Sequence, residues 1–219
     1  MERITDAFGW PVRDPEWLTK VLIIALTLLI PIAGSINGIG WMLASLDRLR
    51  AGEERLAPAH LGHIGRGVRV FVVNLVYALA LVLVAALLYT PAVLIFIHEG
   101  RGSPDAGLVS LGVLLSLLAF SAATLGSLAL SFALPSIVLA TEKSGIAGGL
   151  TVPDVLRRLR LNIASTLIAG LMLIAAAFIG SLGTVACGVG VLFTSAYALA
   201  MQAWIIRSFE LGSQTAGSA

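Results

Sequence analysis

Two histidines are the side chains best placed to do chemistry in this chain. His60 and His63 stand three positions apart in His60-Leu-Gly-His63, so their imidazoles would share one face of a helix. Zinc usually takes three or four ligands, and the sequence offers no second pair of His or Cys. We therefore predict solvated histidines, with no metal site and no other cofactor.

Catalytic groups are equally scarce. The single cysteine, Cys187, is flanked by glycine and apolar residues, which is the setting of an inert packing residue. No serine, cysteine or carboxylate pair stands in a recognisable catalytic arrangement. A small charged patch with Glu99, Arg101 and Asp105 is interpreted as a solvated hairpin loop. We predict that the protein is not an enzyme.

Two basic segments have the residue types that contact anionic lipid headgroups. Arg66 and Arg69 precede one long apolar stretch, and Arg157, Arg158 and Arg160 precede another. Cations at such places are attracted to the negatively charged cytoplasmic leaflet. We expect these five side chains to contact headgroups, with anionic membrane lipids as partners.

The segment 142–160, which carries the second basic group, is predicted to form a short amphipathic helix on the cytoplasmic surface. Thr151-Val-Pro-Asp154 has the features of a helix start, namely a capping Thr, an early Pro and an acid in the first turn. The apolar residues that follow would share one face of this helix.

Four amides interrupt the apolar stretches, namely Asn37, Asn74, Asn162 and Gln202. An amide is costly in hydrocarbon, so each should face protein or water. They are candidates for a polar cavity or, alternatively, for contacts between helices.

The composition indicates what kind of protein carries these residues. Hydrophobic residues make up 58% of the chain and charged residues 12%, against about 25% charged in soluble domains. Mean hydropathy is +0.98. A soluble enzyme, a nucleic-acid binder and a disordered chain are thereby excluded, and a net charge of +2 suggests no nucleic-acid partner. We predict an all-α, polytopic transmembrane helical bundle in the cell membrane.

The gaps between charges locate the spans of this single membrane domain. A crossing helix needs about 20 apolar residues. Four clear spans are predicted, at residues 70–97, 106–135, 161–184 and 189–207. The other predicted segments are an interfacial N-terminus at 1–16, a basic cytoplasmic loop at 51–69 and a flexible tail at 208–219.

The first hydrophobic segment, residues 17–50, contains a candidate helix break at Pro31, Gly34 and Gly38. It is either a kinked fifth span or a re-entrant hairpin. Lys and Arg concentrate on the cytoplasmic side, and the hairpin places thirteen of the fourteen there, against ten for the span. We prefer the hairpin, which makes both termini cytoplasmic; the C-terminus is cytoplasmic in either case.

The four tryptophans lie near predicted span ends, where indole rings favour the headgroup layer. We expect Trp10, Trp17, Trp41 and Trp204 at membrane interfaces.

Several short motifs resemble those of the DUF4013 family, multi-span membrane proteins of bacteria and archaea without an assigned function. The motifs are Gly9-Trp10-Pro11, Asp14-Pro15-Glu16-Trp17, Pro31-Ile32, Gly40-Trp41, Gly52-Glu53-Glu54-Arg55-Leu56, Leu159-Arg160-Leu161-Asn162, Cys187-Gly-Val-Gly190 and Ala196-Tyr197. The resemblance covers nearly the whole chain. The family usually follows its Gly-Glu motif with Leu-Pro, an aromatic residue and acids, whereas this chain has Leu56-Ala57-Pro58-Ala59-His60. The resemblance implies a fold and a location, and no activity.

Two functions are consistent with these features. The first is a non-enzymatic accessory subunit or lipid-interacting scaffold, with a protein partner or a second copy of the chain. The alternative is a small permease or exporter for an apolar or neutral solute, because broken helices often form substrate sites in transporters.

Overall fold

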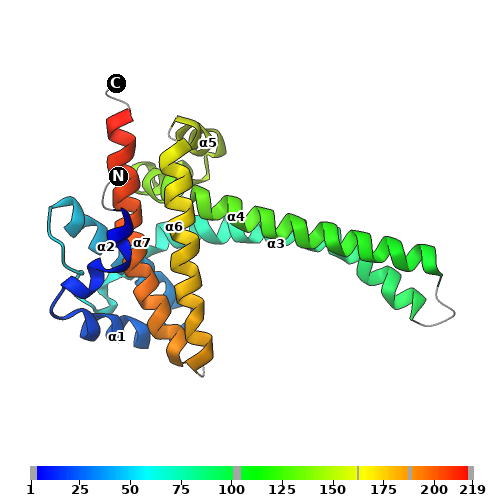
Figure 1. The fold of residues 1–219 in the computed structure, drawn as a ribbon, viewed down its shortest axis with the longest axis horizontal. Helices are drawn as coiled ribbons and strands as arrows, with labels where there is room; N and C mark the ends of the chain where they lie inside the picture. The colour runs from blue at the N-terminus through cyan, green and yellow to red at the C-terminus, as the bar shows by residue number, and fades with distance from the viewer. Residues whose placement is uncertain (1–3, 101–104, 162, 187–188, 217–219) are drawn as a thin grey trace. The chain divides into compact units, whose positions relative to one another are not determined.

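A computed structural model describes residues 4–100, 105–161, 163–186 and 189–216. Within these ranges the chain is helical and has no strand, which confirms the all-α prediction (Figure 1). The α-helices are α1 Trp17–Thr27, α2 Pro31–Arg50, α3 Ile64–Glu99, α4 Ala106–Leu150, α5 Val152–Leu161, α6 Ile163–Leu182 and α7 Val189–Ala216. Short 3-10 helices cover Ile4–Phe8, Trp10–Arg13, Leu61–His63 and Gly183–Ala186.

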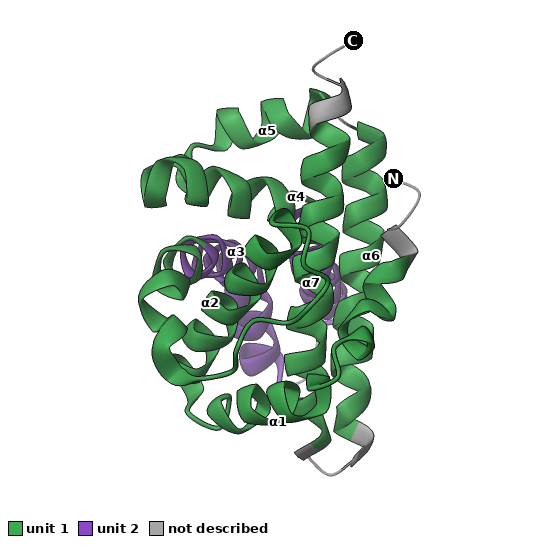
Figure 2. Cartoon of the chain, turned by 90° about the vertical axis from the view of Figure 1, so that its left-hand side faces the viewer, with its two compact units in different colours: residues 1–73, 131–219 green, residues 74–130 purple. Residues whose placement is uncertain are grey.

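The chain divides into two compact units. Unit 1 consists of Met1–Val73 and Ser131–Ala219, and unit 2 is Asn74–Leu130 (Figure 2). Helices α3 and α4 each contribute residues to both units, because each is continuous across the boundary.

Helix α7 is the central helix of unit 1. It packs against α1, α2 and α6, and against both N-terminal 3-10 helices. Its Met201, Ile205 and Ile206 are fully buried, together with Trp41 and Leu46 of α2. The core of unit 1 therefore forms around α7.

Two tryptophans are part of this core and do not contact headgroups. Trp10 and Trp41 have no exposed surface, and their indole N–H groups donate to Ala200 O (3.2 Å) and Ala57 O (2.9 Å). Trp10 also stacks on Trp204, with ring centroids 5.7 Å apart. A buried indole needs an acceptor for its N–H, and the backbone supplies one here. The prediction of an interfacial position is wrong for Trp10 and Trp41.

The N-terminal hydrophobic segment is a helix–break–helix unit. The break covers residues 28–30, and Pro31 is the first residue of α2, where a missing N–H costs nothing. Gly34 and Gly38 lie inside α2 and do not break it. They instead allow close packing: a Cβ on Gly34 would collide with the carbonyl oxygen of Thr27, and one on Gly38 would lie 2.8 Å from Leu199.

Unit 2 consists of the segments of α3 and α4 that pack against each other. Gly112 of α4 lies against Phe96, and Gly126 lies against Leu81, so closely that an added methyl group would have to displace these side chains. At the end of this pair, Asp105 caps α4 by accepting from the N–H groups of Gly107 (2.7 Å) and Leu108 (3.1 Å). The Asp105 N–H donates to Glu99, 8% exposed, so these acids have a structural role; Arg101 lies outside the described residues.

Helix α4 is longer than predicted. It continues through Pro135 and bends only at Gly145, where φ is 69° and ψ is −164°. This left-hand region is accessible to glycine and strained for other residues. After the bend, α5 begins at Val152, as the sequence predicts, but the Thr151 hydroxyl donates to Ala147 O (2.8 Å) and does not cap the new helix.

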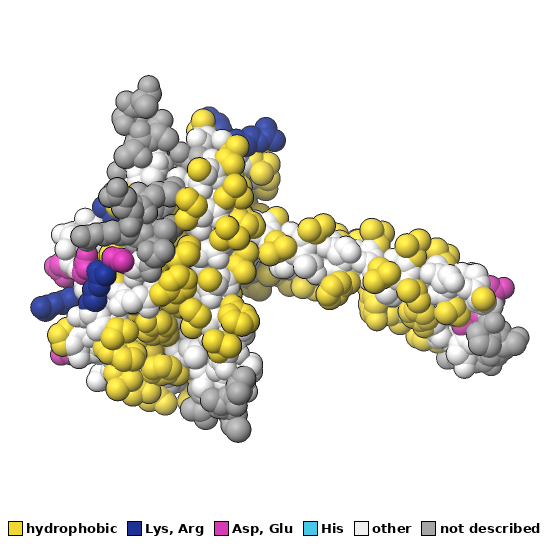
Figure 3. Space-filling model, in the orientation of Figure 1, with side chains coloured by type: hydrophobic (Ala, Val, Ile, Leu, Met, Phe, Trp, Pro, Cys, Tyr) yellow, Lys and Arg dark blue, Asp and Glu magenta, His cyan; other side chains and the backbone are white. Residues whose placement is uncertain are grey.

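Among the described residues, three helices are long and apolar enough to cross a membrane. They are Leu61–Glu99, Ala106–Leu150 and Ile163–Leu182, with hydropathies of 2.7, 2.2 and 2.3. Only 11% of the residues in the most apolar part of each of the first two helices are buried. Many apolar side chains lie along the face of α3, α4 and α6 that Figure 3 shows. The predicted count of four or five spans is not confirmed, since neither the N-terminal segment nor α7 is among these helices.

We expect Gly34→Ala to destabilise the protein by about 1–3 kcal/mol, because the added methyl group must push α1 away from α2. The measurement is thermal unfolding in mild detergent, followed by circular dichroism. Gly65→Ala is the matched control, since a Cβ there has no neighbour within 4 Å. Equal stability losses in the two variants would contradict close packing at Gly34.

Candidate functional site

A cluster of six charged side chains joins four helices of unit 1. It holds three cations and three acids, so its formal charge is zero. The members are Asp47 and Arg50 of α2, Arg66 of α3, Glu142 of α4, and Arg207 and Glu210 of α7. This cluster could not be predicted from the sequence, because its partners lie up to 160 positions apart.

Arg50 is the most connected member. Its Nη2 lies 2.9 Å from Glu142, its Nε lies 3.0 Å from Glu210, and its Nη1 lies 3.2 Å from Asp47. The Arg50 side chain is 27% exposed and the Glu142 side chain 17%. Because the groups are partly removed from water, these pairs are stronger than pairs on an open surface.

Arg66 completes the cluster. Its Nη2 lies 3.0 Å from the second oxygen of Glu142, and its Nη1 donates to Asp47. Arg66 thus holds two carboxylates while its side chain stays 39% exposed, and its contact with headgroups stays a prediction.

The cluster shifts the ionisation of its members. Burial alone would raise the pKa of Asp47, but hydrogen bonds from Arg66 and Arg50 outweigh it and hold the pKa below its ordinary value. Burial also opposes the charge of Arg50, yet the bonds to Glu210 and Glu142 raise its pKa overall. Both shifts favour the charged forms of Asp47 and Arg50 at neutral pH.

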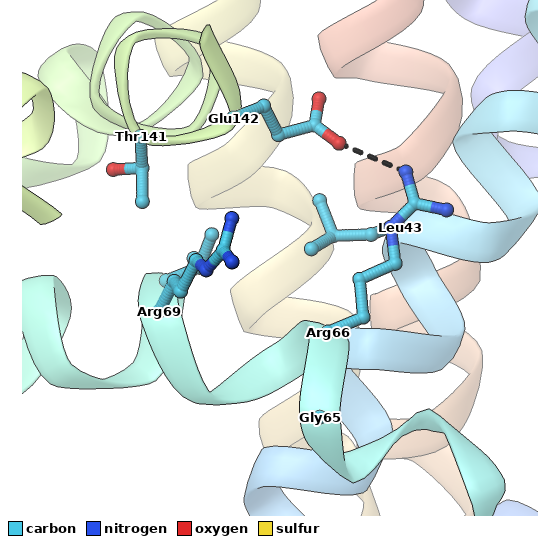
Figure 4. Close-up of a pocket in the computed structure, with 7 residues that line it drawn as sticks. Leu43, Gly65, Arg66, Arg69, Thr141 and Glu142 are labelled. Atoms are coloured by element: carbon cyan, nitrogen blue, oxygen red, sulfur yellow. Dashed lines mark hydrogen bonds and ion pairs between the residues drawn. The ribbon is translucent and has the colours of Figure 1, made fainter. Parts of the chain in front are cut away.

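A pocket of about 320 Å³ lies beside this cluster (Figure 4). Its lining residues are Leu43, Gly65, Arg66, Arg69, Val70, Thr141 and Glu142. Arg69 extends from α3 toward Thr141 and Glu142 on α4, and it forms no ion pair with any described residue (Figure 4). An unpaired guanidinium at a pocket wall can bind an anion.

The second basic group lies on α5. Val155 is buried, whereas Leu156 and Leu161 are 45% and 71% exposed. Arg157 is exposed and pairs with Asp154, three positions earlier, at 3.2 Å. Arg158 and Arg160 form no ion pair within the described ranges. Cations and apolar side chains are therefore exposed side by side on α5.

A buried ion pair at the start of α1 is a further site that the sequence did not reveal. Asp14, 1% exposed, accepts from Lys20 Nζ (2.8 Å) and from the Leu56 N–H (2.9 Å). Burial by itself would raise the pKa of Asp14, but these bonds and one from the Glu16 N–H lower it. The pair fixes the loop after α2 against α1.

The two histidines stack with ring centroids 4.2 Å apart. His60 accepts from the Gly62 N–H, and His63 bonds to Pro58 O (2.9 Å), so both rings order their own loop. No group of three or more His, Cys, Asp or Glu that could hold a metal is present among the described residues.

One of the four candidate amides, Asn37, joins a helix to a loop. Asn37 is fully buried; its Nδ2 donates to His60 O (3.1 Å) and its Oδ1 accepts from the His63 N–H (3.2 Å). It therefore fixes the segment at His60 and His63 against α2. Asn74 and Gln202 are half-buried and do not line the pocket beside Arg69, and Asn162 lies outside the described residues, as does Cys187.

Comparison with known proteins gives one match. A family model described as "Protein of unknown function (DUF4013)" matches residues 23–189, which is most of the chain. No curated protein and no solved structure matches.

We expect Glu142→Gln to lower the free energy of unfolding by about 1–3 kcal/mol, since Arg50 and Arg66 each lose a carboxylate partner. Chemical unfolding in detergent measures this. Lys143→Gln, at an exposed neighbour without an ion pair among the described residues, should cost less than about 0.5 kcal/mol. Equal effects would show that the cluster contributes little to stability.

Asp14→Asn should cost about 3–5 kcal/mol at neutral pH, because the largely buried Lys20 ammonium then keeps only the exposed Glu16, at 3.3 Å, as an acid partner. The folded pKa of Asp14 lies below its ordinary value of 3.8, so its stabilisation is complete well above pH 4 and disappears as pH falls through and below that value. Melting temperatures of the variant should therefore fall less steeply between about pH 6 and pH 3 than those of the wild type.

The matched control for this measurement is Asp154→Asn, which removes an exposed acid and should follow the wild-type pH profile. A variant profile at Asp14 parallel to that of the wild type would contradict the role given to the Asp14–Lys20 pair.

Proposed function

The chain belongs to the DUF4013 family, and we propose that it is a non-enzymatic integral membrane protein that acts as a lipid-interacting scaffold. In this proposal its apolar helices lie in the bilayer of the cell membrane, and α5 binds the anionic headgroups of the cytoplasmic leaflet. The C-terminus, and with it the N-terminus, is cytoplasmic.

The observation that carries the proposal is the surface of α5. Exposed Leu156 and Leu161 stand beside the exposed cations Arg157 and Arg160. In water, this surface would expose the two leucine side chains to solvent. At a membrane boundary the leucines would enter the acyl region while the arginines meet phosphates. Helix α6, one of the three spanning candidates, starts two residues after α5 ends, which supports this position.

The exposed apolar surface of the three long helices supports the same placement. Leu87, Phe120 and Phe178 are 67%, 72% and 64% exposed. Helix α6 has 20 residues, or roughly 30 Å, which equals the thickness of the hydrocarbon core. No Asp, Glu, Lys or Arg occurs within α6, so a bilayer is a suitable solvent for it.

The permease alternative receives less support from the contacts. It relied on a polar substrate path at the break near Pro31, with Asn37 inside it. Both polar atoms of the Asn37 amide are already bonded to the loop at His60 and His63. A substrate would have to displace these bonds.

We expect Arg157→Ala, Arg158→Ala and Arg160→Ala together to lower the enrichment of anionic lipid on the purified protein about fivefold or more, since each cation near the surface contributes roughly 1 kcal/mol. The protein is extracted with phosphatidylglycerol and phosphatidylcholine in equal amounts, and the retained ratio is measured by mass spectrometry. The triple Lys variant is the control and should retain the enrichment, because it keeps the charge.

Unchanged enrichment in the Ala variant would contradict the proposal. The same spectra report any protein that copurifies, and a stoichiometric partner would make the accessory-subunit function the better description.

A further inference from the structure

Among the charged side chains at and beside the pocket in Figure 4, one cation, Arg69, has no acidic partner in the described part of the chain. Arg50, Arg66 and Arg207 are matched by Asp47, Glu142 and Glu210. Arg69 lies at the same pocket wall and has no ion-pair partner in the described part of the chain. The pocket therefore carries a surplus of one positive charge.

The acid in the pocket does not cancel this surplus. Each oxygen of Glu142 accepts from a different arginine, one at 2.9 Å and the other at 3.0 Å. Its charge is already shared between Arg50 and Arg66. An anion that entered the pocket would meet the Arg69 guanidinium without direct competition from Glu142.

The lining of the pocket has a polar side and an apolar side. Val70 and Leu43 are buried at 2% and 1% exposure and give an apolar wall, whereas Arg69 and Arg66 give donors. Gly65 leaves open space, since a Cβ placed there has no neighbour within 4 Å. An apolar wall next to a cation suits a ligand that is itself anionic at one end and apolar at the other.

The position of Arg69 in the chain supports the same ligand. It is the last charged residue before the uncharged stretch Val70–Ile97 of α3. In a helix that crosses a bilayer, this is the level at which lipid phosphates lie.

We propose that this pocket binds one phosphate group carrying a single negative charge, as in the phosphodiester of an anionic phospholipid headgroup, with Arg69 as the principal contact. The inference rests on the proposed lipid-binding function and adds a discrete, saturable site to it. The planar guanidinium of Arg69 can donate two parallel hydrogen bonds to phosphate oxygens. A diester charge of −1 would neutralise the surplus.

The test uses the full-length protein in neutral detergent and isothermal titration calorimetry. The probes are dihexanoyl phosphatidylglycerol below its micelle concentration and inorganic phosphate. We expect the lipid probe to bind with one saturable site per chain. Arg69→Gln should weaken it tenfold or more, and Arg69→Lys should retain part of the affinity. The control is Arg55→Gln, at an exposed arginine of the loop after α2 that forms no ion pair among the described residues, and it should leave the affinity unchanged.

A second variant tests the pocket without changing its charge. Gly65→Leu places a bulky side chain in the open space and should also weaken the lipid probe, while the melting temperature shows whether the fold is retained. Equal affinity for inorganic phosphate would identify free phosphate as the source of the ligand. Tighter binding of the lipid probe would identify the headgroup.

Three outcomes would overturn the inference: no saturable binding of either probe, full affinity in Arg69→Gln, or equal losses in Arg69→Gln and Arg55→Gln. Failure of this inference and failure of the proposed function give different results. If the Arg69 variant binds the lipid probe like the wild type while the enrichment of anionic lipid still depends on α5, only the inference fails. If the Arg69 variant loses the lipid probe while the enrichment does not depend on α5, only the scaffold proposal fails.

Discussion

The Glu142 carboxylate, shared between Arg50 and Arg66, is the interaction on which the arrangement of unit 1 most depends. Its two oxygens hold guanidinium groups from residues 92 and 76 positions away. Through Arg50 the same charges reach Glu210 on α7. Charged groups at the ends of apolar helices are stable when they are paired, and costly when one partner is missing. The cluster meets this requirement with an equal number of cations and acids.

Hydropathy located the apolar helices but could not distinguish helices that face lipid from a helix that faces protein. Both environments accept the same side chains. Ile205 and Ile206 of α7 have no exposed surface, whereas Phe178 of α6 is 64% exposed, and nothing in the local sequence separates these cases. Trp10 and Trp41 were misinterpreted for the same reason, since an indole near a span end suits a headgroup layer as well as a core that supplies a carbonyl acceptor.

Proline and glycine differ in how much of their effect is local. Pro31 lacks a backbone donor whatever surrounds it, so the sequence placed the start of α2 near it correctly. The effect of Gly34 depends on what lies opposite, and the opposite group is the Thr27 carbonyl of α1. Arg66 and Arg69 show the same limit: three positions apart and alike in sequence, one is bound to two acids and the other is free of ion pairs among the described residues. Only the fold separates them.

This separation gives the molecule two kinds of basic surface. On α5, Arg157 and Arg160 are exposed, and salt screens interactions of such charges over about 8 Å at physiological ionic strength. Anion binding there therefore depends on the number of charges. At Arg69 an apolar wall of Leu43 and Val70 lies beside the cation, so anion binding there depends on the shape of the pocket. Each basic surface precedes a stretch without Asp, Glu, Lys or Arg, and we propose the phosphate of a lipid as the anion that binds both. The proposed scaffold would then bind one class of ligand in two ways, on a surface where the number of charges matters and in a pocket where shape matters.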